Sequence, residues 1–256
     1  MKEILITNDD GYEANGLKAL IDALRPIARL TIVAPASEKS SCGHSLTLTR
    51  PLKFISVGDD FYKLDDGSPS DCVYLALNSL FSHRAPDLIV SGINHGANLG
   101  EDTIYSGTVA AAMEAVLHNV PAIAISQYRN KDENGGFGYD FELAAKIARE
   151  VVEKVFAKGF PLPPRQLLNI NIPHIRPNEY KGLKITRASR RVYHNDALRG
   201  VNPRGEEYFW LGAHPFDFTP TENGDYEAII EGYASITPIM CDLTAYRSIE
   251  TLDKWI

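Results

Sequence analysis

Short apolar runs alternate with stretches of helical period along the first part of the chain. The first run, Ile4-Leu5-Ile6, ends in the polar turn Asn8-Asp9-Asp10-Gly11, and apolar residues then recur at i, i+3, i+4 and i+7 from Leu17 to Leu24. A short run rich in β-branched residues and closed by a glycine turn is typical of a buried parallel strand. The spacing that follows is typical of a helix with one buried stripe. The same alternation predicts further core strands at 30–34, 87–91, 122–126 and 167–172, and helices over 73–81, 109–118 and 144–155.

Alternating strands and helices of this kind form right-handed crossovers between parallel strands. The predicted fold class is therefore α/β, a doubly wound, mostly parallel sheet with helices on both faces. Additional short strands are expected at 45–49, 52–57 and 61–64, and either Ser70 or Asp71 is expected as the N-cap of the helix over 73–81. A polar, glycine-rich loop over 130–138 is expected to be mobile.

The pattern changes near Pro177, which divides the chain into a core over 1–176 and a C-terminal part over 177–256. The C-terminal part is rich in aromatic residues, and short strands are predicted at 183–186, 207–211, 226–231 and 234–237, followed by a short helix within 242–255. Such a segment suits a β arm that buries its aromatic side chains against a partner chain. The alternative is that it folds back on its own core.

Composition excludes several classes of protein. The chain has 256 residues, enough for one large α/β domain or one domain plus an extension, and a net charge of -7 argues against general binding to nucleic acid. No apolar run approaches the ~18 residues of a membrane span, and the first strand begins too early for a signal peptide. The three cysteines are scattered, without CxxC spacing, which favours reduced thiols in the cytoplasm over a cysteine-ligated zinc site.

Candidate chemistry begins with Asp9 and Asp10 at the carboxyl end of the first strand, where open α/β sheets bind ligands. Adjacent carboxylates repel each other unless a cation, hydrogen bonds or solvent relieve them. The alternative is ordinary turn chemistry, with Asp9 as an N-cap. On this stretch alone the two interpretations are equally supported.

Two further loops reach the same edge of the predicted sheet. The polar loop after the second strand carries Ser40 and Ser41. The loop after the 87–91 strand carries Asn94 and Asn98, and the sequence Ser106-Gly107-Thr108 then opens an alanine-rich helix. Amide N–H groups and hydroxyls at a helix start favour an anion, so we expect phosphate there in addition to simple capping.

Together the three loops supply two carboxylates, a hydroxyl and an amide carbonyl. This all-oxygen set suits one hard divalent cation, Mg²⁺ or Mn²⁺, and is poor for zinc. A cation beside a phosphate site polarises the phosphoryl group and lowers the pKa of a water. The chemistry indicated is hydrolysis of phosphate monoesters.

The residues now in place resemble those of the survival protein E (SurE) family, the 5′/3′-nucleotidases. The resembling segments are 6–11, 34–47, 67–73, 91–114 and 235–244. The resemblance implies a cytoplasmic phosphatase that uses a divalent metal to hydrolyse nucleoside monophosphates, with some members also trimming short polyphosphate. It implies a Rossmann-like, three-layer core and a C-terminal β arm exchanged between subunits of a homodimer or homotetramer.

Carried over residue by residue, the resemblance assigns catalytic roles to Asp9 and Asp10 and one metal ion per subunit. The implied metal ligands are Asp9, Asp10, Ser40 and Asn94, and the implied phosphate-binding residues are Asn98, Ser106, Gly107 and Thr108. The sequence Lys39-Ser40-Ser41 departs from the Ser-Gly of many members, so Ser41 remains an alternative to Ser40.

Three other hypotheses remain open from the residues alone. Asp9 or Asp10 as a covalent nucleophile is disfavoured because phosphatases of that kind carry Asp-x-Asp after the first strand. A non-catalytic nucleotide or metal sensor would use the same site without turnover. A nicotinamide-dependent enzyme is disfavoured because no Gly-x-Gly-x-x-Gly follows the first strand.

Overall fold

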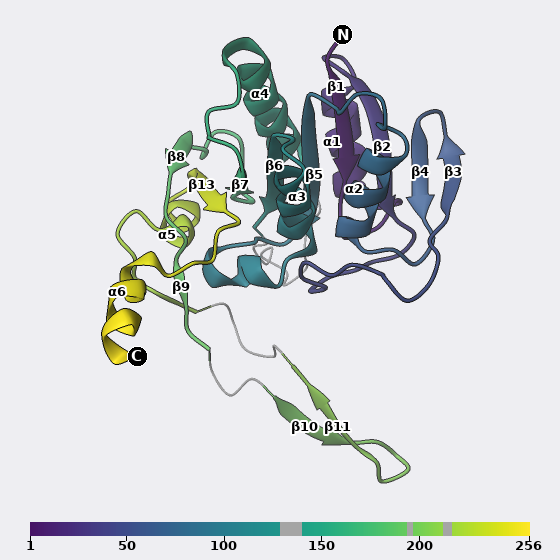
Figure 1. The fold of residues 1–256 in the computed structure, drawn as a ribbon. Coiled ribbons are helices and arrows are strands. Elements are labelled where there is room, and N and C mark those ends of the chain that lie inside the picture. Colours follow the sequence, from purple (N-terminus) through teal and green to yellow (C-terminus); the bar gives the residue numbers. More distant parts are fainter. Residues whose placement is uncertain (129–139, 194–196, 212–216) are drawn as a thin grey trace.

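A nine-stranded sheet forms the centre of the computed structural model, which describes residues 1–128, 140–193, 197–211 and 217–256 (Figure 1). The strand order is β3-β4-β2-β1-β5-β6-β7-β13-β8, and the six strands from β4 to β7 in that order are parallel. The strands are β1 (Glu3–Thr7), β2 (Arg29–Pro35), β3 (Phe54–Gly58), β4 (Phe61–Leu64), β5 (Leu88–His95), β6 (Ala122–Gln127), β7 (Gln166–Ile172), β8 (Leu183–Ile185) and β13 (Ala234–Met240).

Helices cover both faces of this sheet. Helices α1 (Asn15–Leu24) and α4 (Glu142–Lys158) pack on one face, and α2 (Pro69–Asn78) and α3 (Gly107–Leu117) pack on the other. The predicted stripe of α1 is fully buried at Leu17, Leu20 and Leu24. The structure therefore confirms the Rossmann-like, three-layer α/β class predicted from the sequence.

Strand β1 occupies the point where the strand order reverses. Its apolar run Ile4-Leu5-Ile6 is fully buried, and the strand pairs with β2 on one side and β5 on the other. The chain winds outward through β2 and β4 in one direction and through β5, β6 and β7 in the other. In open α/β sheets, ligands bind beyond the carboxyl ends of the strands at this switch point.

Two local predictions in the first part of the chain are wrong. Residues 45–49 form no strand, although Ser, Thr and Leu alternate there; Leu48 is 88% exposed, and Thr47 donates from its backbone and hydroxyl to the Asp71 carboxylate. The N-cap of α2 is Ser68, whose hydroxyl accepts from the Asp71 N–H while the Asp71 carboxylate accepts from the Ser68 N–H. This capping box places the start of α2 earlier than Ser70 or Asp71.

The predicted strand over 226–231 is instead helix α5 (Asp225–Ile230). Its six residues fit either period, and tertiary packing decides between them. Ala228 and Ile229 are buried, and Ile229 packs with Leu99 and Phe218 in a small apolar cluster beside the main core. The helix over the C-terminus is confirmed as α6 (Tyr246–Trp255), and the expected loop over 130–138 lies outside the described residues.

The sheet also extends beyond residue 176, where the sequence led us to end the core. Strand β13 pairs antiparallel with β7, and β8 pairs parallel with β13, so part of the C-terminal segment completes the central sheet. The part of the C-terminal segment that could form the expected arm is therefore smaller. It is the hairpin of β10 (Leu198–Val201) and β11 (Glu207–Trp210). Figure 1 shows this hairpin projecting away from the body.

The remaining elements connect the hairpin to the body. Strands β9 (Arg190–Arg191) and β12 (Phe218–Thr219) pair with each other, and the 3-10 helix η1 (Gly100–Ile104) lies against β9. Within the described ranges, no helix combines the length and the apolar character needed to cross a membrane.

Candidate active site

Asp9 lies directly after β1 and faces the N-terminus of α3. Its carboxylate accepts two hydrogen bonds from Thr108, one from the hydroxyl at 2.5 Å and one from the backbone N–H at 3.1 Å. Only 3% of Asp9 is exposed. The pKa of Asp9 is raised from its ordinary 3.8 to about 6, chiefly by burial and also by the neighbouring Asp10 charge, against the opposing effect of the Thr108 hydrogen bonds. A cation at this position would relieve both unfavourable effects on the ionised carboxylate.

Asp10 turns towards β5 instead. Its Oδ2 accepts from the backbone N–H of His95 at 3.0 Å, and its Oδ1 lies 3.3 Å from the His95 Nδ1. The His95 ring in turn packs against the ring of Phe141, with 5.1 Å between the centroids. The Asn8 side chain donates to the Gly11 carbonyl, which supports the turn that carries both carboxylates.

Asn94 precedes His95 at the end of β5, in a stretch where the pairing of β5 with β6 shifts register between Ser91 and Asn94. Its Nδ2 donates to the Gly96 carbonyl at 2.8 Å. Because the amide nitrogen is used in that bond, the amide oxygen Oδ1 is the atom available to a cation. Because His95 contacts Asp10, Asn94 lies at the same edge as the paired carboxylates.

The loop over 36–47 reaches this edge from β2. The Lys39 N–H donates to the Asp9 carbonyl at 2.7 Å, so the loop backbone runs beside Asp9 just before Ser40. Ser40 itself is exposed, and its hydroxyl donates to the Glu38 carboxylate at 2.7 Å. Ser41 is also exposed and has a positive φ of 57°. The structure therefore brings this loop to the site, with the Ser40 hydroxyl bonded within the loop.

Gly107 is packed between Asp9 and this loop. A Cβ added to Gly107 would come within 2.9 Å of both the Asp9 Cβ and the Cys42 Sγ. Real Cβ atoms do not approach so closely, so the close contact of α3 with the site requires glycine at this position. The Cys42 thiol lies in this packed region, where burial and the Asp9 charge raise its pKa and disfavour a reactive thiolate.

Three of the expected phosphate-binding residues, Ser106, Gly107 and Thr108, form the start of α3, and the fourth, Asn98, contacts β6 and β7. The Ser106 hydroxyl accepts from the Val109 N–H at 3.1 Å and so caps the helix. Both donors of Thr108 reach Asp9, as described above. The Asn98 side chain donates to the Ser126 hydroxyl, while its backbone is bonded to the side chains of Asn171 and Asn169 on β7.

A second buried carboxylate holds the far end of the loop that carries Asn98. Asp225 is fully buried, and it accepts hydrogen bonds from the N–H groups of Gly100, Ser189 and Tyr226. Gly100 has a φ of 54°, and a Cβ there would lie 2.1 Å from the Ser189 carbonyl. The site loop is thus joined to the segment that leads into the hairpin.

The donor set at this edge fits a hard divalent cation. In the part of the chain that the structure describes, no three His, Cys, Asp or Glu side chains form a cluster that could hold a metal. A metal here would draw on two carboxylates and on neutral oxygens, as expected for Mg²⁺ or Mn²⁺. The raised pKa of Asp9 agrees with a carboxylate arranged for such a partner.

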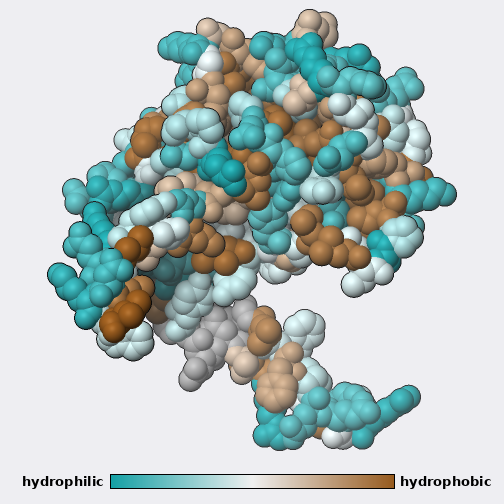
Figure 2. Space-filling view, viewed as in Figure 1, coloured by the Kyte–Doolittle hydropathy of each residue, from teal (hydrophilic) through white to brown (hydrophobic). Residues whose placement is uncertain are grey.

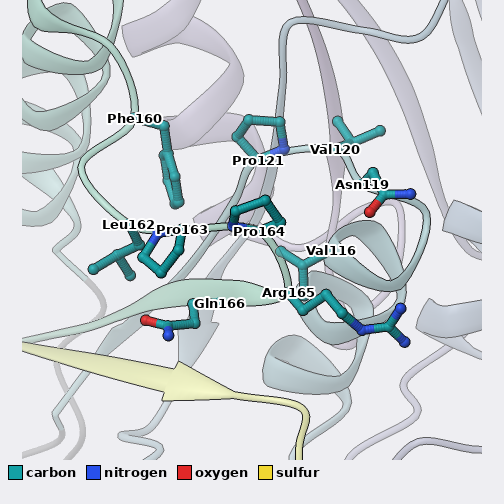
Figure 3. Close-up of a pocket in the computed structure, with 10 residues that line it drawn as sticks. All are labelled: Val116, Asn119, Val120, Pro121, Phe160, Leu162, Pro163, Pro164, Arg165 and Gln166. Carbon is teal, nitrogen blue, oxygen red and sulfur yellow. The ribbon is translucent and has the colours of Figure 1, made fainter.

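Two hollows in the surface lie elsewhere. A cavity of about 160 Å³ lies between Pro121, which precedes β6, and Gln166, which begins β7; Figure 3 shows the residues that line it. Since β6 and β7 are parallel to β1, this cavity lies at the amino ends of the strands, opposite Asp9. A larger apolar groove of about 320 Å³ lies between α4 and the strands β8 and β13. Neither hollow contains any of the expected site residues.

The sequence did not predict that His95 belongs to the site or that Thr108 contacts Asp9. His95 was not among the expected residues, although it adjoins Asn94 and contacts Asp10 through both its backbone and its ring. Thr108 was expected to bind phosphate, and in the structure it bonds to Asp9. The adjacency of Asn94 and His95 after a buried strand was the available signal for His95.

Comparison with known proteins identifies the family. The family model described as "Survival protein SurE" matches residues 4–195. The chain belongs to the SurE family. It is 57% identical to a protein named 5′-nucleotidase SurE from a Nitratiruptor species, over 100% of both chains. It is 55% identical to the 5′-nucleotidase SurE of Aliarcobacter butzleri, over 100% of this chain and 99% of the relative.

A solved structure agrees with the family assignment. The crystal structure of the SurE protein from Aquifex aeolicus superposes with a TM-score of 0.86, at 40% identity, over 99% of each chain. The resemblance inferred from the sequence is therefore confirmed. The likeness extends through the C-terminal region, beyond the residues that the family model matches.

Proposed function

We propose that this SurE-family chain is a metal-dependent 5′-nucleotidase that hydrolyses nucleoside monophosphates to nucleoside and inorganic phosphate. Relatives that are 55–57% identical over the full chain carry the name 5′-nucleotidase SurE. The observation that carries the proposal in the structure is the pair Asp9 and Asp10 at the switch point, with Asp9 against the N-terminus of α3. Paired carboxylates beside a helix start suit a cation and a phosphate together.

The residues proposed to hold one divalent ion per subunit, Mg²⁺ or Mn²⁺, are Asp9, Asp10, Ser40 and Asn94. The two carboxylates balance the charge of the ion, so the site does not repel a phosphate group strongly. The Ser40 hydroxyl donates its hydrogen to Glu38, which leaves its oxygen lone pairs for a cation, and Asn94 likewise has its oxygen available. When bound, the ion polarises the phosphoryl group and lowers the pKa of a water.

The other side chains orient these groups and the substrate. Thr108 keeps the Asp9 carboxylate in place, and His95 does the same for Asp10. The N-terminal end of α3, with Ser106, Gly107 and Thr108, is proposed to receive the phosphate together with Asn98, since the helix dipole favours an anion there. Asn169 and Asn171 hold the backbone of Asn98 for this role. Short polyphosphate is a second substrate proposed for the same site.

A screen of phosphate release tests this proposal. Purified protein is incubated with 5′- and 3′-mononucleotides and short polyphosphate, each with Mg²⁺, Mn²⁺ or no added metal. We expect release from nucleoside monophosphates that stops with EDTA and returns when metal is restored. Release that continues unchanged in EDTA would exclude the metal site. Nucleotide binding without turnover across the panel would instead indicate a sensor.

The hairpin of β10 and β11 is proposed to form an interface between copies of the chain in a homodimer or homotetramer. Alternation along the strands places Leu198, Tyr208 and Trp210 on one face, where they are 52%, 44% and 68% exposed. Figure 2 shows hydrophobic and intermediate residues on the part of this element nearer the body and hydrophilic residues at its tip. A lone two-stranded hairpin is at best marginally stable in water, so a partner surface would stabilise it.

The three cysteines, Cys42, Cys72 and Cys241, are all free thiols. Free thiols are typical of reducing compartments. We therefore also propose a cytoplasmic location, which fractionation of the source cells would test.

A further inference from the structure

Helix α3 contains one charged residue, Glu114, in an otherwise apolar sequence. Nine of its eleven residues are buried, and Glu114 is only 4% exposed. An ionised carboxylate in such surroundings is strongly destabilising unless it is paired and hydrogen-bonded. The position of Glu114, six residues after Thr108 on this buried helix, therefore requires specific partners.

Two histidines from different parts of the chain supply those partners. The His44 Nε2 lies 2.7 Å from Glu114 Oε2, and the His118 Nε2 lies 3.0 Å from Glu114 Oε1. An ionised carboxylate only accepts hydrogen bonds, so each histidine carries a hydrogen on Nε2. Burial alone would raise the pKa of Glu114, but the two histidines outweigh it and lower the pKa below its ordinary value.

The two histidines differ in what they connect. His118 follows the last turn of α3, four residues from Glu114, so its bond stays within one element. His44 belongs to the loop over 36–47, seventy positions away, which contains no helix or strand. The bond between His44 and Glu114 therefore joins the middle of this loop to the helix that also contacts Asp9.

Further hydrogen bonds hold the same loop, and three of them flank Ser40 and Ser41. Lys39 donates to the Asp9 carbonyl, Gly43 donates to the Tyr105 carbonyl, and Thr47 donates to the Asp71 carboxylate. Ser40 and Ser41 lie between the first two of these contacts. The side-chain bond at His44 comes directly after them and is anchored on α3, the element that orients Asp9 through Thr108.

We propose that Glu114 is a positioning residue that, through His44, holds the serine-bearing loop over Asp9 so that its hydroxyl is ready to bind the cation. This inference rests on the metal site proposed above. Side chains that orient metal ligands without binding the metal contribute to affinity mainly because the ligands then lose less conformational freedom when the metal binds. The Glu114–His44 pair acts on the ligand loop, whereas the Glu114–His118 pair does not.

The matched test compares His44→Phe with His118→Phe in the full-length chain. The two side chains are similarly exposed, 30% and 32%, and both variants keep a ring while removing the bond to Glu114. Mn²⁺ binding to the metal-stripped protein is measured by electron paramagnetic resonance. Amide hydrogen exchange over 37–47 is measured in parallel. Glu114→Ala and the Glu114→Ala/His44→Phe double variant complete a double-mutant cycle. If the variants of the buried Glu114 fold poorly, His44→Phe still tests the proposal by itself.

We expect His44→Phe to weaken Mn²⁺ binding by roughly 10- to 100-fold, the usual effect of removing a group that orients a ligand. Exchange over 37–47 should become faster, and kcat at saturating Mn²⁺ should change far less than the Mn²⁺ concentration for half-maximal activity. The double variant should bind Mn²⁺ no more weakly than the weaker of the two single variants, because both substitutions break the same contact. The Mn²⁺ affinity of His118→Phe should stay within about threefold of that of the unmodified protein, as for an ordinary surface substitution.

An unchanged Mn²⁺ affinity in His44→Phe would overturn the proposal, as would an equal loss in His118→Phe, which would indicate a general packing role for Glu114. Failure of the metal site itself would look different. In that case the unmodified chain would bind no Mn²⁺ and would release phosphate in EDTA. The two failures are therefore distinguishable.

Discussion

Thr108 donates both its hydroxyl and its backbone N–H to the carboxylate of Asp9, a residue 99 positions earlier in the chain. The contact directs the start of α3 at the end of β1. It stabilises the ionised form of Asp9 against burial, which raises the pKa of the same carboxyl to about 6. The readiness of Asp9 to bind a cation near neutral pH therefore depends on Thr108.

Replacing Thr108 with Val should make cation binding more sensitive to acid. The Thr108 hydrogen bonds lower the pKa of Asp9, so removing the hydroxyl raises that pKa. Protons compete with a metal for the carboxylate, so the fall in Mn²⁺ affinity on acidification should begin at a higher pH. A titration of Mn²⁺ affinity against pH measures this. Thr108→Ser keeps the hydroxyl and should follow the unmodified protein; a shift in both variants would indicate altered packing.

Replacing Asp9 with Asn should abolish turnover while preserving the fold. The amide keeps the shape of the side chain but removes a negative ligand, and polarisation by a metal is worth several kcal/mol. A loss of at least about 10³-fold in kcat/KM is expected, since each 1.36 kcal/mol is tenfold in rate. Asp22, an exposed residue of α1, provides the control Asp22→Asn, which should retain full activity. Substantial activity in Asp9→Asn would remove Asp9 from the site.

Asp9 should also make the metal-free protein less stable as the pH rises. Its pKa is about 6 in the folded chain and about 3.8 when unfolded. Below pH 3.8 both states are protonated and no penalty exists. As pH rises from about 4 to about 6, the unfolded state releases its proton first, so this carboxyl lowers the free energy of unfolding by about 3 kcal/mol. Urea unfolding in EDTA at several pH values measures the effect.

The comparison for that experiment is Asp9→Asn. The free energy of unfolding of this variant should not fall in this way. Its excess over that of the unmodified protein should therefore grow between pH 4 and pH 6. Parallel curves would show that Asp9 titrates alike in the folded and unfolded states. Added Mn²⁺ should restore stability to the unmodified protein, because a ligand that binds the folded state stabilises it.

Removing Asp225 should weaken the attachment of the C-terminal segment to the site loop. Asp225→Ala leaves the buried N–H groups of Gly100 and Ser189 without their acceptor, whereas the Tyr226 N–H also donates to the Ser189 hydroxyl. Each unsatisfied buried donor costs about 1–3 kcal/mol, so a loss of about 2 kcal/mol or more is expected in urea unfolding. Asp22→Ala is the control and should change little. A loss below about 1 kcal/mol would show that the Gly100 and Ser189 donors find other partners.

The hairpin should decide the oligomeric state. Trp210→Asp places a charge on the exposed apolar face, so sedimentation velocity should show a smaller assembly than the unmodified chain forms. Arg204→Asp changes the charge at the exposed turn of the same hairpin without touching that face, and it should leave the assembly intact. A monomeric unmodified chain, or an unaltered assembly in Trp210→Asp, would contradict the interface.

Local patterns were sufficient for much of the core. The apolar run of β1 and the helical spacing in α1 are visible within a few residues, because burial of one face imposes a period of two or 3.6. The same reasoning failed over 226–231, where six residues fit either period and packing against Leu99 and Phe218 selects the helix. It failed over 45–49 because Thr47 is bonded to Asp71 and no strand pairs with this segment.

By itself, then, the sequence determined the fold class, the placement of Asp9 and Asp10 after a buried strand, and the glycine and asparagine loop that follows β5. Only the tertiary structure decided that Thr108 bonds to Asp9, that His95 bonds to Asp10, and that β13 inserts beside β7. The first pair is 99 positions apart along the chain and the second is 85 positions apart. Contacts over such separations follow from strand order and register, which local apolar patterning does not encode.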